Sequence, residues 1–146
     1  MEIKKLLQHE IEAFKTLITI FNEVFENEAE IPAARHLEKL LSNPDFMVFV
    51  VQVNGQVVGG LTIYVLHRYY DTKPIAYIYD VGITPNFQGK GLGKALIAEV
   101  CRFCRESGFE DAYVEAESED KDAVEFYRKT NFTYEMAATH FTYSFD

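Results

Sequence analysis

Three features are scarce in this sequence of 146 residues: basic residues, cysteines and long apolar runs. Lys and Arg total 14 against 23 Asp and Glu, a net charge of −9 that argues against binding to nucleic acid or anionic membranes. A cationic partner fits this charge better. No apolar run approaches the roughly 18 residues of a membrane span, and the N-terminus leads into no signal-type apolar segment. These absences predict a cytoplasmic protein.

The two cysteines, Cys101 and Cys104, lie one helical turn apart inside a predicted helix. A redox pair would ordinarily follow a strand, and a zinc site would need further Cys or His residues at characteristic spacings. The four histidines are scattered along the chain. The sequence therefore predicts ordinary thiols and no metal site.

The composition suits one domain over residues 1–146, since 48% apolar residues with 12 Phe and 9 Tyr can fill a substantial core. Hydrophobic periodicity predicts a βααβββαβαββ order. The expected elements are a strand at 3–7, helices at 11–25 and 32–43, strands at 46–53, 57–65 and 75–83, a helix at 91–107, a strand at 111–117, a helix at 120–130, and short strands at 133–135 and 139–145.

Local signals indicate how these elements connect. Asn54-Gly55 between β-branched runs predicts a hairpin, and Asp71-Thr72-Lys73-Pro74 is expected to interrupt the strand pattern. The strand–helix–strand unit from Ile75 to Glu117 predicts two parallel neighbours. The expected fold class is α/β (α+β), with one mixed, mostly antiparallel sheet that holds a central parallel strand pair.

The most informative segment runs from Gln88 to Gly93 and reads Gln-Gly-Lys-Gly-Leu-Gly. It follows an apolar run that ends in Val81-Gly82-Ile83 and precedes an amphipathic stretch, which is the pattern of a strand, a glycine loop and a helix start. Free backbone N–H groups and the positive end of a helix dipole meet at such a junction. The segment therefore predicts an anion site, in the first place for phosphate. The plainer alternative is a loop that only turns tightly.

Two familiar phosphate loops do not fit this segment. A P-loop needs Ser or Thr after Gly-Lys, whereas Ala95 follows Gly93-Lys94 here. The dinucleotide pattern Gly-x-Gly-x-x-Gly is also absent, because Gly89, Gly91 and Gly93 alternate. The pattern that remains, Gln-x-x-Gly-x-Gly between a strand and a helix, resembles the acyl-CoA pyrophosphate loop of the GNAT superfamily of N-acetyltransferases.

The resemblance extends along the chain. The segment from Asp120 to Phe132 is similar to a later GNAT segment, with Asp120 in place of the common Asn and Asn131 in place of the common Gly. Nearly the whole chain resembles the aminoglycoside 3-N-acetyltransferases that act on gentamicin-type drugs. The element Tyr77-Ile-Tyr-Asp80 carries that likeness most specifically.

This resemblance implies acetyl-CoA as the co-substrate and assigns its contacts. The pantetheine arm would pair like a strand with Val81 and Ile83, and Gly82 is expected to mark a bulge there. Asp120 and Tyr127 take the positions of further cofactor contacts. The backbone groups assigned to the pyrophosphate are those of Gln88, Gly89, Lys90, Gly91, Leu92, Gly93 and Lys94.

Acetyl transfer to an amine needs a neutral nitrogen, a polarised thioester carbonyl and a proton for the departing thiolate. By resemblance, Tyr127 lies near the cofactor sulfur and serves as the acid. A phenol of pKa about 10 can protonate a thiolate of pKa about 8.5 only with help from geometry. The alternative role of Tyr127 is that of a core side chain on the Ala123 face of its helix.

Acidic residues supply the predicted acceptor contacts. Asp80 lies in a strand where an unpaired carboxylate is costly, so it faces a cleft or makes a buried structural hydrogen bond. Glu115 and Glu117 share a face of the next strand, either at that cleft or in solvent. Asp80 and Glu117 are the predicted bases, acting directly or through water. Tyr79 and Glu26 complete the predicted acceptor site, although the acidic run around Glu26 also fits a solvated surface.

The last predicted strand places Phe141, Tyr143 and Phe145 on one side, in the core or in the interface of a homodimer. The sequence thus predicts a GNAT-like enzyme that moves acetyl from acetyl-CoA to an amine of a cationic small molecule, in the first place an aminoglycoside 3-amino group. The alternatives are a polyamine, an amino acid or a protein amine as acceptor, and a non-catalytic acyl-CoA-binding domain.

Overall fold

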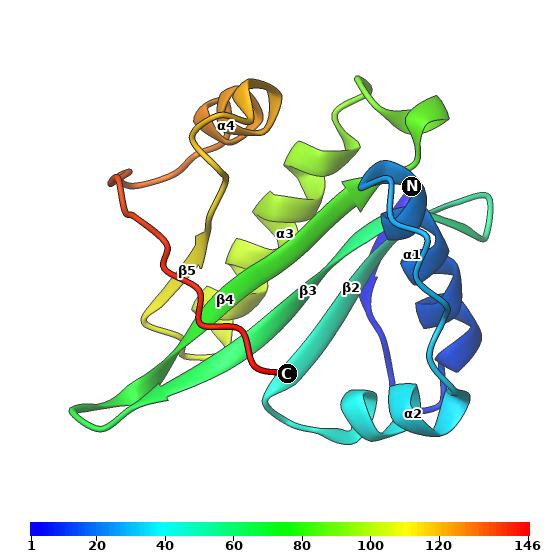
Figure 1. Cartoon of the computed structure of the whole chain (residues 1–146), viewed down its shortest axis with the longest axis horizontal. Coiled ribbons are helices and arrows are strands. Elements are labelled where there is room, and N and C mark those ends of the chain that lie inside the picture. Colours follow the sequence, from blue (N-terminus) through cyan, green and yellow to red (C-terminus); the bar gives the residue numbers. More distant parts are fainter.

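The computed structural model describes residues 1–146 as a five-stranded sheet with helices on both faces (Figure 1). The strands lie in the order β1-β2-β3-β4-β5, antiparallel except for the parallel pair β4 and β5. This sheet confirms the predicted fold class, except that the parallel pair lies at the β5 edge of the sheet rather than at its centre. The elements are β1 (Glu2–Lys5), α1 (Ile11–Val24), α2 (Ala34–Ser42), β2 (Phe46–Val53), β3 (Gln56–Arg68), β4 (Asp71–Ile83), the 3-10 turn η1 (Pro85–Phe87), α3 (Leu92–Glu106), β5 (Asp111–Val114) and α4 (Lys121–Arg128).

Strand β2 shows how the sheet is covered on both faces. Its residues from Phe46 to Val51 are all buried, as a strand with helices above and below requires. Met47 and Phe49 join the core beneath α3, whereas Val48 and Val50 join a second core beneath α1 and α2. The strand alternation therefore distributes one apolar run between two cores.

Two adjacent glycines let β2, β3 and β4 approach closely. A Cβ at Gly60 would overlap the Phe49 carbonyl oxygen, and one at Gly59 would stand 2.6 Å from the Gly82 carbonyl oxygen. A side chain at Gly60 would push β2 away from β3, and one at Gly59 would push β4 away from β3. The glycines therefore fix the position of the carboxyl end of β4, where the glycine loop begins.

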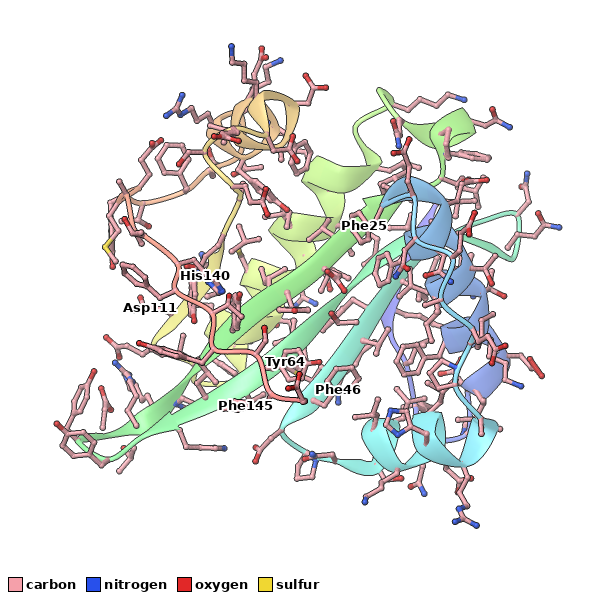
Figure 2. The ribbon with its side chains drawn as sticks, viewed as in Figure 1. Phe25, Phe46, Tyr64, Asp111, His140 and Phe145 are labelled. Carbon is pink, nitrogen blue, oxygen red and sulfur yellow. The ribbon has the colours of Figure 1, made fainter.

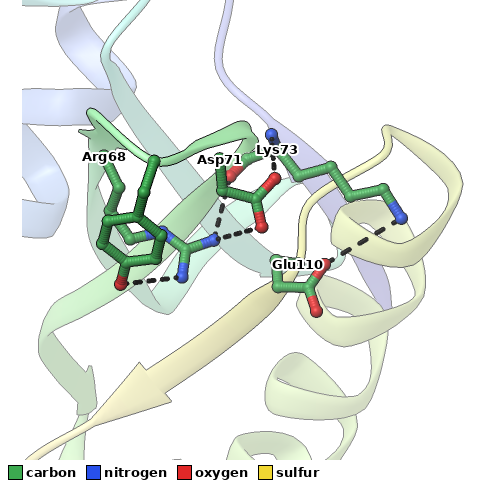
Figure 3. Close-up of polar contacts among 5 residues, drawn as sticks. Arg68, Asp71, Lys73 and Glu110 are labelled. Carbon is green, nitrogen blue, oxygen red and sulfur yellow. Dashed lines mark hydrogen bonds and ion pairs between the residues drawn. The ribbon is translucent and has the colours of Figure 1, made fainter.

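The tip of the β3–β4 hairpin is held by Arg68 (Figure 3). Its guanidinium donates to the Asp71 carboxylate at 3.3 Å and to the Lys73 carbonyl at 3.1 Å. The Asp71 carboxylate also accepts from the Lys73 N–H at 2.9 Å, and the Pro74 carbonyl accepts from the Glu110 N–H at 2.9 Å. These bonds hold residues 71–74 extended, so the prediction that they interrupt the strand is wrong.

Other element ends differ from expectation by a few residues. Strand β5 ends at Val114 rather than at 117, because its pairing with β4 ends there. Helix α2 begins at Ala34, so Pro32 precedes the helix instead of occupying its first turn. Cys101 and Cys104 are free and lie in α3, where burial raises the pKa of Cys104 to about 11.

No strand forms after α4, so the predicted strands at 133–135 and 139–145 are wrong for the single chain. The backbone from Asn131 to Asp146 makes no backbone–backbone hydrogen bond, and every residue in this segment is exposed. A strand needs a neighbouring edge, and no other part of the chain pairs with this one. In Figure 1 the segment crosses in front of β4 and β3, on the face opposite α3.

None of the helices combines the length and the apolar character that a membrane span requires. No three His, Cys, Asp or Glu side chains gather closely enough to hold a metal ion.

Candidate active site

The glycine loop joins the carboxyl end of β4 to the start of α3. Gly89 and Gly91 have φ angles of +75° and +82°, in the left-handed region that side chains disfavour. A Cβ at either position would meet no atom within 4 Å. Backbone conformation therefore requires these two glycines, and the space beside them is open to a ligand.

The backbone N–H groups of this junction lack acceptors. None of those from Gly89 to Lys94 donates a hydrogen bond within the protein, and the first helical bond runs from the Ala95 N–H to the Gly91 carbonyl at 3.0 Å. Gly91 is the N-cap and offers no side chain to the free donors. Together with the helix dipole, these donors make a site for an anion with several oxygens, such as a pyrophosphate.

Two residues of the loop have structural roles that the sequence did not reveal. The Gln88 side chain donates to the Ile83 carbonyl at 2.8 Å and ties the loop to the end of β4. A Cβ at Gly93 would stand 3.0 Å from the Phe126 ring, so this glycine lets α4 pack on the first turn of α3. Gly93 therefore has a packing role, and the assignment of its backbone N–H to the pyrophosphate stays a prediction.

Strand β4 contains a bulge at Tyr79 and Asp80. Leu61 pairs with Val81 and Ile63 pairs with Ile78, so two residues of β4 oppose Thr62 alone. The prediction of a bulge at Gly82 is wrong, because Gly82 stays paired with Gly60. Gly82 instead makes room for the Phe21 ring of α1, 3.0 Å from where a Cβ would stand.

The bulge lies where the parallel strands separate. Strand β5 pairs with residues 75–78 of β4 and with none beyond them, so residues 79–83 have a strand neighbour on the β3 side only. The Asp80 N–H donates to the Thr62 hydroxyl at 3.3 Å, whereas the Asp80 carboxylate accepts no hydrogen bond from the protein. This result excludes the alternative of a buried structural hydrogen bond for Asp80.

The half-buried Asp80 carboxylate has an altered affinity for protons. Burial disfavours its charged form and raises its pKa above the ordinary value of 3.8. Its charge in turn contributes to the raised pKa of Tyr127 and of Tyr64, which brings the three side chains into one neighbourhood. An unpaired carboxylate in such a position is available to a cationic ligand.

Tyr127 lies in α4 and is partly buried against the core beneath α3. Burial, followed by the charges of Asp120 and Asp80, raises its pKa to about 12. The phenol is therefore protonated at neutral pH and can donate a hydrogen bond. The structure thus supports the predicted core position of Tyr127, and its proximity to the cofactor sulfur stays a prediction.

The other predicted acids lie farther out. Glu115 accepts a hydrogen bond from the Tyr77 hydroxyl at 3.0 Å, and burial and this bond raise the pKa of Tyr77 to about 12. Glu117 is exposed, and its carbonyl accepts from the Asp120 N–H at 2.9 Å. Glu26 is exposed in the turn after α1, with a φ of +54°. No contact joins Glu117 or Glu26 to Asp80, and their roles stay predictions.

Asp120 is the N-cap of α4. Its carboxylate accepts from the Ala123 N–H at 3.2 Å, which satisfies one of the free donors of that helix. The family resemblance assigned Asp120 to the cofactor and did not indicate the cap. The available signal was an Asp directly before an amphipathic stretch, which is typical of a helix N-cap.

A row of aromatic rings crosses the sheet beside Asp80 and was also missed. Phe46 of β2 is followed by Tyr64 of β3, Tyr79 and Tyr77 of β4 and Tyr113 of β5. Successive ring centroids lie 5.3, 5.4, 5.7 and 4.7 Å apart. The alternating tyrosines of the Tyr-Ile-Tyr element could have predicted this row, because residues two apart on a strand share a face of the sheet.

Comparison with known proteins assigns the family. A sequence profile of the acetyltransferase (GNAT) family matches residues 14–132. The chain belongs to this family, whose members use acetyl-CoA. It is a GNAT N-acetyltransferase by sequence and by fold.

Among solved structures, the chain is similar to an aminoglycoside acetyltransferase from an uncultured soil metagenomic sample, crystallised with sisomicin. The identity is 42% and the TM-score 0.97, over 99% of this chain and 96% of that one. The same enzyme with trehalose gives a TM-score of 0.96. The superposition extends past residue 132, where the family match ends, so both proteins share the C-terminal segment.

Curated relatives match over shorter stretches. A mycothiol acetyltransferase of Pseudarthrobacter chlorophenolicus is 29% identical over 100 residues, which is 68% of this chain and 31% of that protein. A glucosamine 6-phosphate N-acetyltransferase of Trypanosoma brucei brucei is 29% identical over 86 residues, which is 58% of this chain and 56% of that protein. The chain thus spans about a third of the first relative's length and little more than half of the second's.

Proposed function

We propose that the chain transfers the acetyl group of acetyl-CoA to an amine of an aminoglycoside, at the 3-amino group. The observation that carries the proposal is the open carboxyl end of β4, where the unpaired carboxylate of Asp80 and the free N–H groups of Gly89 to Lys94 lie on neighbouring segments. One feature suits a cationic amine and the other suits a pyrophosphate. The 42% identity to an aminoglycoside acetyltransferase supports the choice of acceptor.

The residues of the glycine loop fit coenzyme A. The N–H groups from Gly89 to Lys94 would hold the pyrophosphate, since they have no acceptor within the protein and the space beside Gly89 and Gly91 is open. The Gln88 side chain acts through the Ile83 carbonyl and positions the loop. The pantetheine arm would lie along Val81 to Ile83, where β4 has lost its β5 neighbour. Bound there, acetyl-CoA supplies the activated thioester.

Asp80 would hold the acceptor and take its proton. An aminoglycoside arrives as a polycation, which a chain of net charge −9 attracts. The Asp80 carboxylate, with no protein donor to compete, pairs with the ammonium group, which first loses one proton to solvent. Asp80 then accepts the second proton as the neutral nitrogen attacks the thioester carbonyl. Glu117 and Glu115 would contact other amino groups, and Glu117 could relay a proton through water.

Tyr127 would act on the departing sulfur. Its pKa of about 12 keeps the phenol protonated at neutral pH. Full transfer of that proton to a thiolate of pKa about 8.5 is uphill by about 5 kcal/mol, at about 1.4 kcal/mol for each pKa unit. A hydrogen bond from the phenol to the developing thiolate therefore fits the structure better than complete proton transfer before the C–S bond breaks.

A substrate panel with thiol detection tests the proposal. Sisomicin, gentamicin, kanamycin, spermidine and an N-terminal peptide amine are each incubated with acetyl-CoA and the protein. Mass spectrometry then counts acetyl groups, and NMR locates them. We expect acetylation of sisomicin and gentamicin on the 3-amino group.

Other outcomes separate the alternatives. Turnover of spermidine or the peptide without turnover of any aminoglycoside would contradict the acceptor and leave acetyl transfer intact. Binding of acetyl-CoA without thiol release for any amine would indicate the non-catalytic domain.

A further inference from the structure

Thr62 is the one polar residue that the fold buries, with 7% of its surface exposed. It lies in β3 between Leu61 and Ile63, which are fully buried in the core beneath α3. The Thr62 side chain lies on the other face of the sheet, because successive residues of a strand alternate between faces. A buried hydroxyl is costly unless it is hydrogen-bonded, so its presence where an isosteric Val would fit requires an explanation.

The Thr62 hydroxyl oxygen accepts a hydrogen bond from the bulge of β4. Its donor is the Asp80 N–H, at 3.3 Å. Tyr79 and Asp80 both stand opposite Thr62, so β4 has one residue more than β3 at this point. The extra residue of a bulge is left out of the regular ladder, and here a side chain of the facing strand binds its N–H. The buried hydroxyl therefore serves the bulge.

The bulge decides where the Asp80 carboxylate lies. Ile78 is buried in the core beneath α3, and Val81 packs against the same core. In a regular strand Asp80 would share the face of Ile78, where a carboxylate without a donor is costly. The extra residue takes Asp80 out of this alternation. The side chain is consequently only half-buried, and its charge contributes to the raised pKa of Tyr64 on β3.

Strand β3 also holds the other residue of the bulge. The rings of Tyr64 and Tyr79 meet edge to face, with their centroids 5.4 Å apart. In Figure 2, Tyr64 lies beside Phe46 on the face of the sheet opposite α3. Thr62 and Tyr64 are two residues apart on β3 and share this face. One strand thus contacts both residues of the bulge, Tyr79 through an aromatic ring and Asp80 through a hydroxyl.

We infer that Thr62 is a positioning residue for acetyl transfer, whose hydroxyl holds the bulge so that the Asp80 carboxylate reaches the acceptor amine. This role rests on the proposed function of Asp80, whereas the hydrogen bond belongs to the fold. Because Thr62 is buried, it acts through Asp80 and not on the acceptor itself. Without the hydroxyl, the Asp80 N–H turns to another acceptor and the carboxylate moves with it, which misplaces the base.

Two substitutions separate the hydroxyl from the shape of the side chain. Thr62→Val keeps the shape and removes the hydroxyl, and its kcat with sisomicin should fall about fivefold. Thr62→Ser keeps the hydroxyl and should stay within about twofold of wild type, although it leaves a small cavity. Packing alone predicts the opposite order. Thr62→Ala, compared with Thr62→Ser, repeats the test if the Val variant fails to fold. Wild-type turnover without the hydroxyl, or an equal loss in Thr62→Ser, would overturn the inference.

A double variant tests whether Thr62 acts through Asp80. Asp80→Asn alone is expected to lower turnover about tenfold, and adding Thr62→Val should change this value less than about twofold, since the carboxylate to be positioned is already gone. Independent effects would multiply to a loss of about fiftyfold and would overturn the inference. The control Thr19→Val removes an exposed hydroxyl that donates to the Lys15 carbonyl at 3.1 Å, and it should be silent in both backgrounds.

Amide hydrogen exchange, followed by NMR, tests the hydrogen bond without turnover. The Asp80 N–H should be protected in wild type and in Thr62→Ser, and should exchange at least about tenfold faster in Thr62→Val, with the amides of the regular ladder as internal reference. Equal exchange in Thr62→Val and wild type would overturn the inference. If the wild type acetylates no amine, the proposed function fails, and the exchange rates still decide whether the Thr62 hydroxyl holds the bulge.

Discussion

Two helices start close to the proposed site, and their first turns differ. The N-cap of α3 is Gly91, which has no side chain, and the N–H groups of the first turn find no acceptor in the protein. The N-cap of α4 is Asp120, whose carboxylate accepts from the Ala123 N–H. Both starts carry the same dipole, so the difference lies in whether the chain supplies its own anion.

The difference separates a binding element from a structural one. An uncapped helix start inside a protein leaves donors unsatisfied, a cost that is recovered when a ligand brings oxygen acceptors. A capped start has no such demand. The contact of Gly93 with the Phe126 ring joins the two helices, so the capped helix supports the open one and presents Tyr127 beside it.

The largest expected effect comes from giving α3 the carboxylate that α4 has. Gly91→Asp would place a negative group among the free N–H donors, compete for them and repel phosphate. Loss of two charge-assisted bonds of roughly 1.5 kcal/mol each should weaken binding of coenzyme A at least about 100-fold by calorimetry. The control is Gly108→Asp, at a similar φ of +83° after the end of α3. Wild-type affinity in Gly91→Asp would remove the pyrophosphate assignment.

The next effect tests whether α4 contributes to the chemistry as well as to support. Tyr127→Phe removes the hydroxyl and leaves the ring in the core, so turnover should fall roughly 100-fold while the affinity for coenzyme A changes little. Steady-state kinetics and calorimetry measure the two quantities separately. Tyr69→Phe, at the exposed hairpin tip, should be silent. Equal turnover in Tyr127→Phe and wild type would reject a catalytic phenol.

Asp80→Asn tests the carboxylate at the end of β4, which we propose as the base. Turnover should fall about tenfold if Glu117 can partly replace the base through water. In the wild type, kcat/KM should decrease as the pH falls through the raised pKa of Asp80, above 3.8, and the variant should lose this acid limb. An unaltered profile in the variant would assign the limb to another group.

The same variant should change stability in a defined direction. Because folding raises the pKa of Asp80, protonation stabilises the native state fully below the ordinary value of 3.8, and this contribution is lost as the pH rises through the raised pKa. The neutral Asn should therefore melt higher than wild type at pH 7, with the advantage disappearing in acid. Thermal denaturation across that range measures the effect.

The smallest effect is expected at the cap itself. Asp120→Ala should cost about 1 kcal/mol of stability and lower the Tm by about 2–4 °C, since one helix-start donor loses its acceptor. Asp120→Asn keeps the acceptor and should be near wild type. Activity should stay within about twofold in both variants, unless the residue contacts the cofactor as the sequence suggested. A large activity loss in Asp120→Ala, with activity kept in Asp120→Asn, would favour that contact.

The glycine loop could be predicted from sequence because its signal is local. A strand, three alternating glycines and an amphipathic stretch occupy one continuous segment, and the anion site follows from helix geometry. The separate roles of Gln88 and Gly93 could not be predicted. The first depends on where the Ile83 carbonyl lies after folding, and the second on Phe126 from a helix more than thirty residues away.

Strand pairing explains the other differences. The bulge at Tyr79 and Asp80 depends on how β3 pairs with β4, so it cannot be predicted from the sequence of either strand alone. Residues 139–145 have a clear strand pattern, but a strand also needs a neighbouring edge, and no other part of the chain pairs with this segment. From sequence alone, the Asp71–Pro74 segment predicts a break in the strand. The hydrogen bonds from the Arg68 guanidinium that hold the segment extended form only in the folded chain.

The arrangement around Thr62 has a consequence for variation in this protein. The ladder between β3 and β4 is regular from Gly59 to Leu61 and again from Ile63 to Leu66, so shortening β4 by this one residue would leave Leu61 opposite Val81 and Ile63 opposite Ile78. The carboxylate therefore occupies a supernumerary position that the sheet does not need for its own alignment. A deletion variant at this site should keep the fold and lose the carboxylate, so it would test the proposed role of Asp80 in a hairpin that is otherwise unchanged.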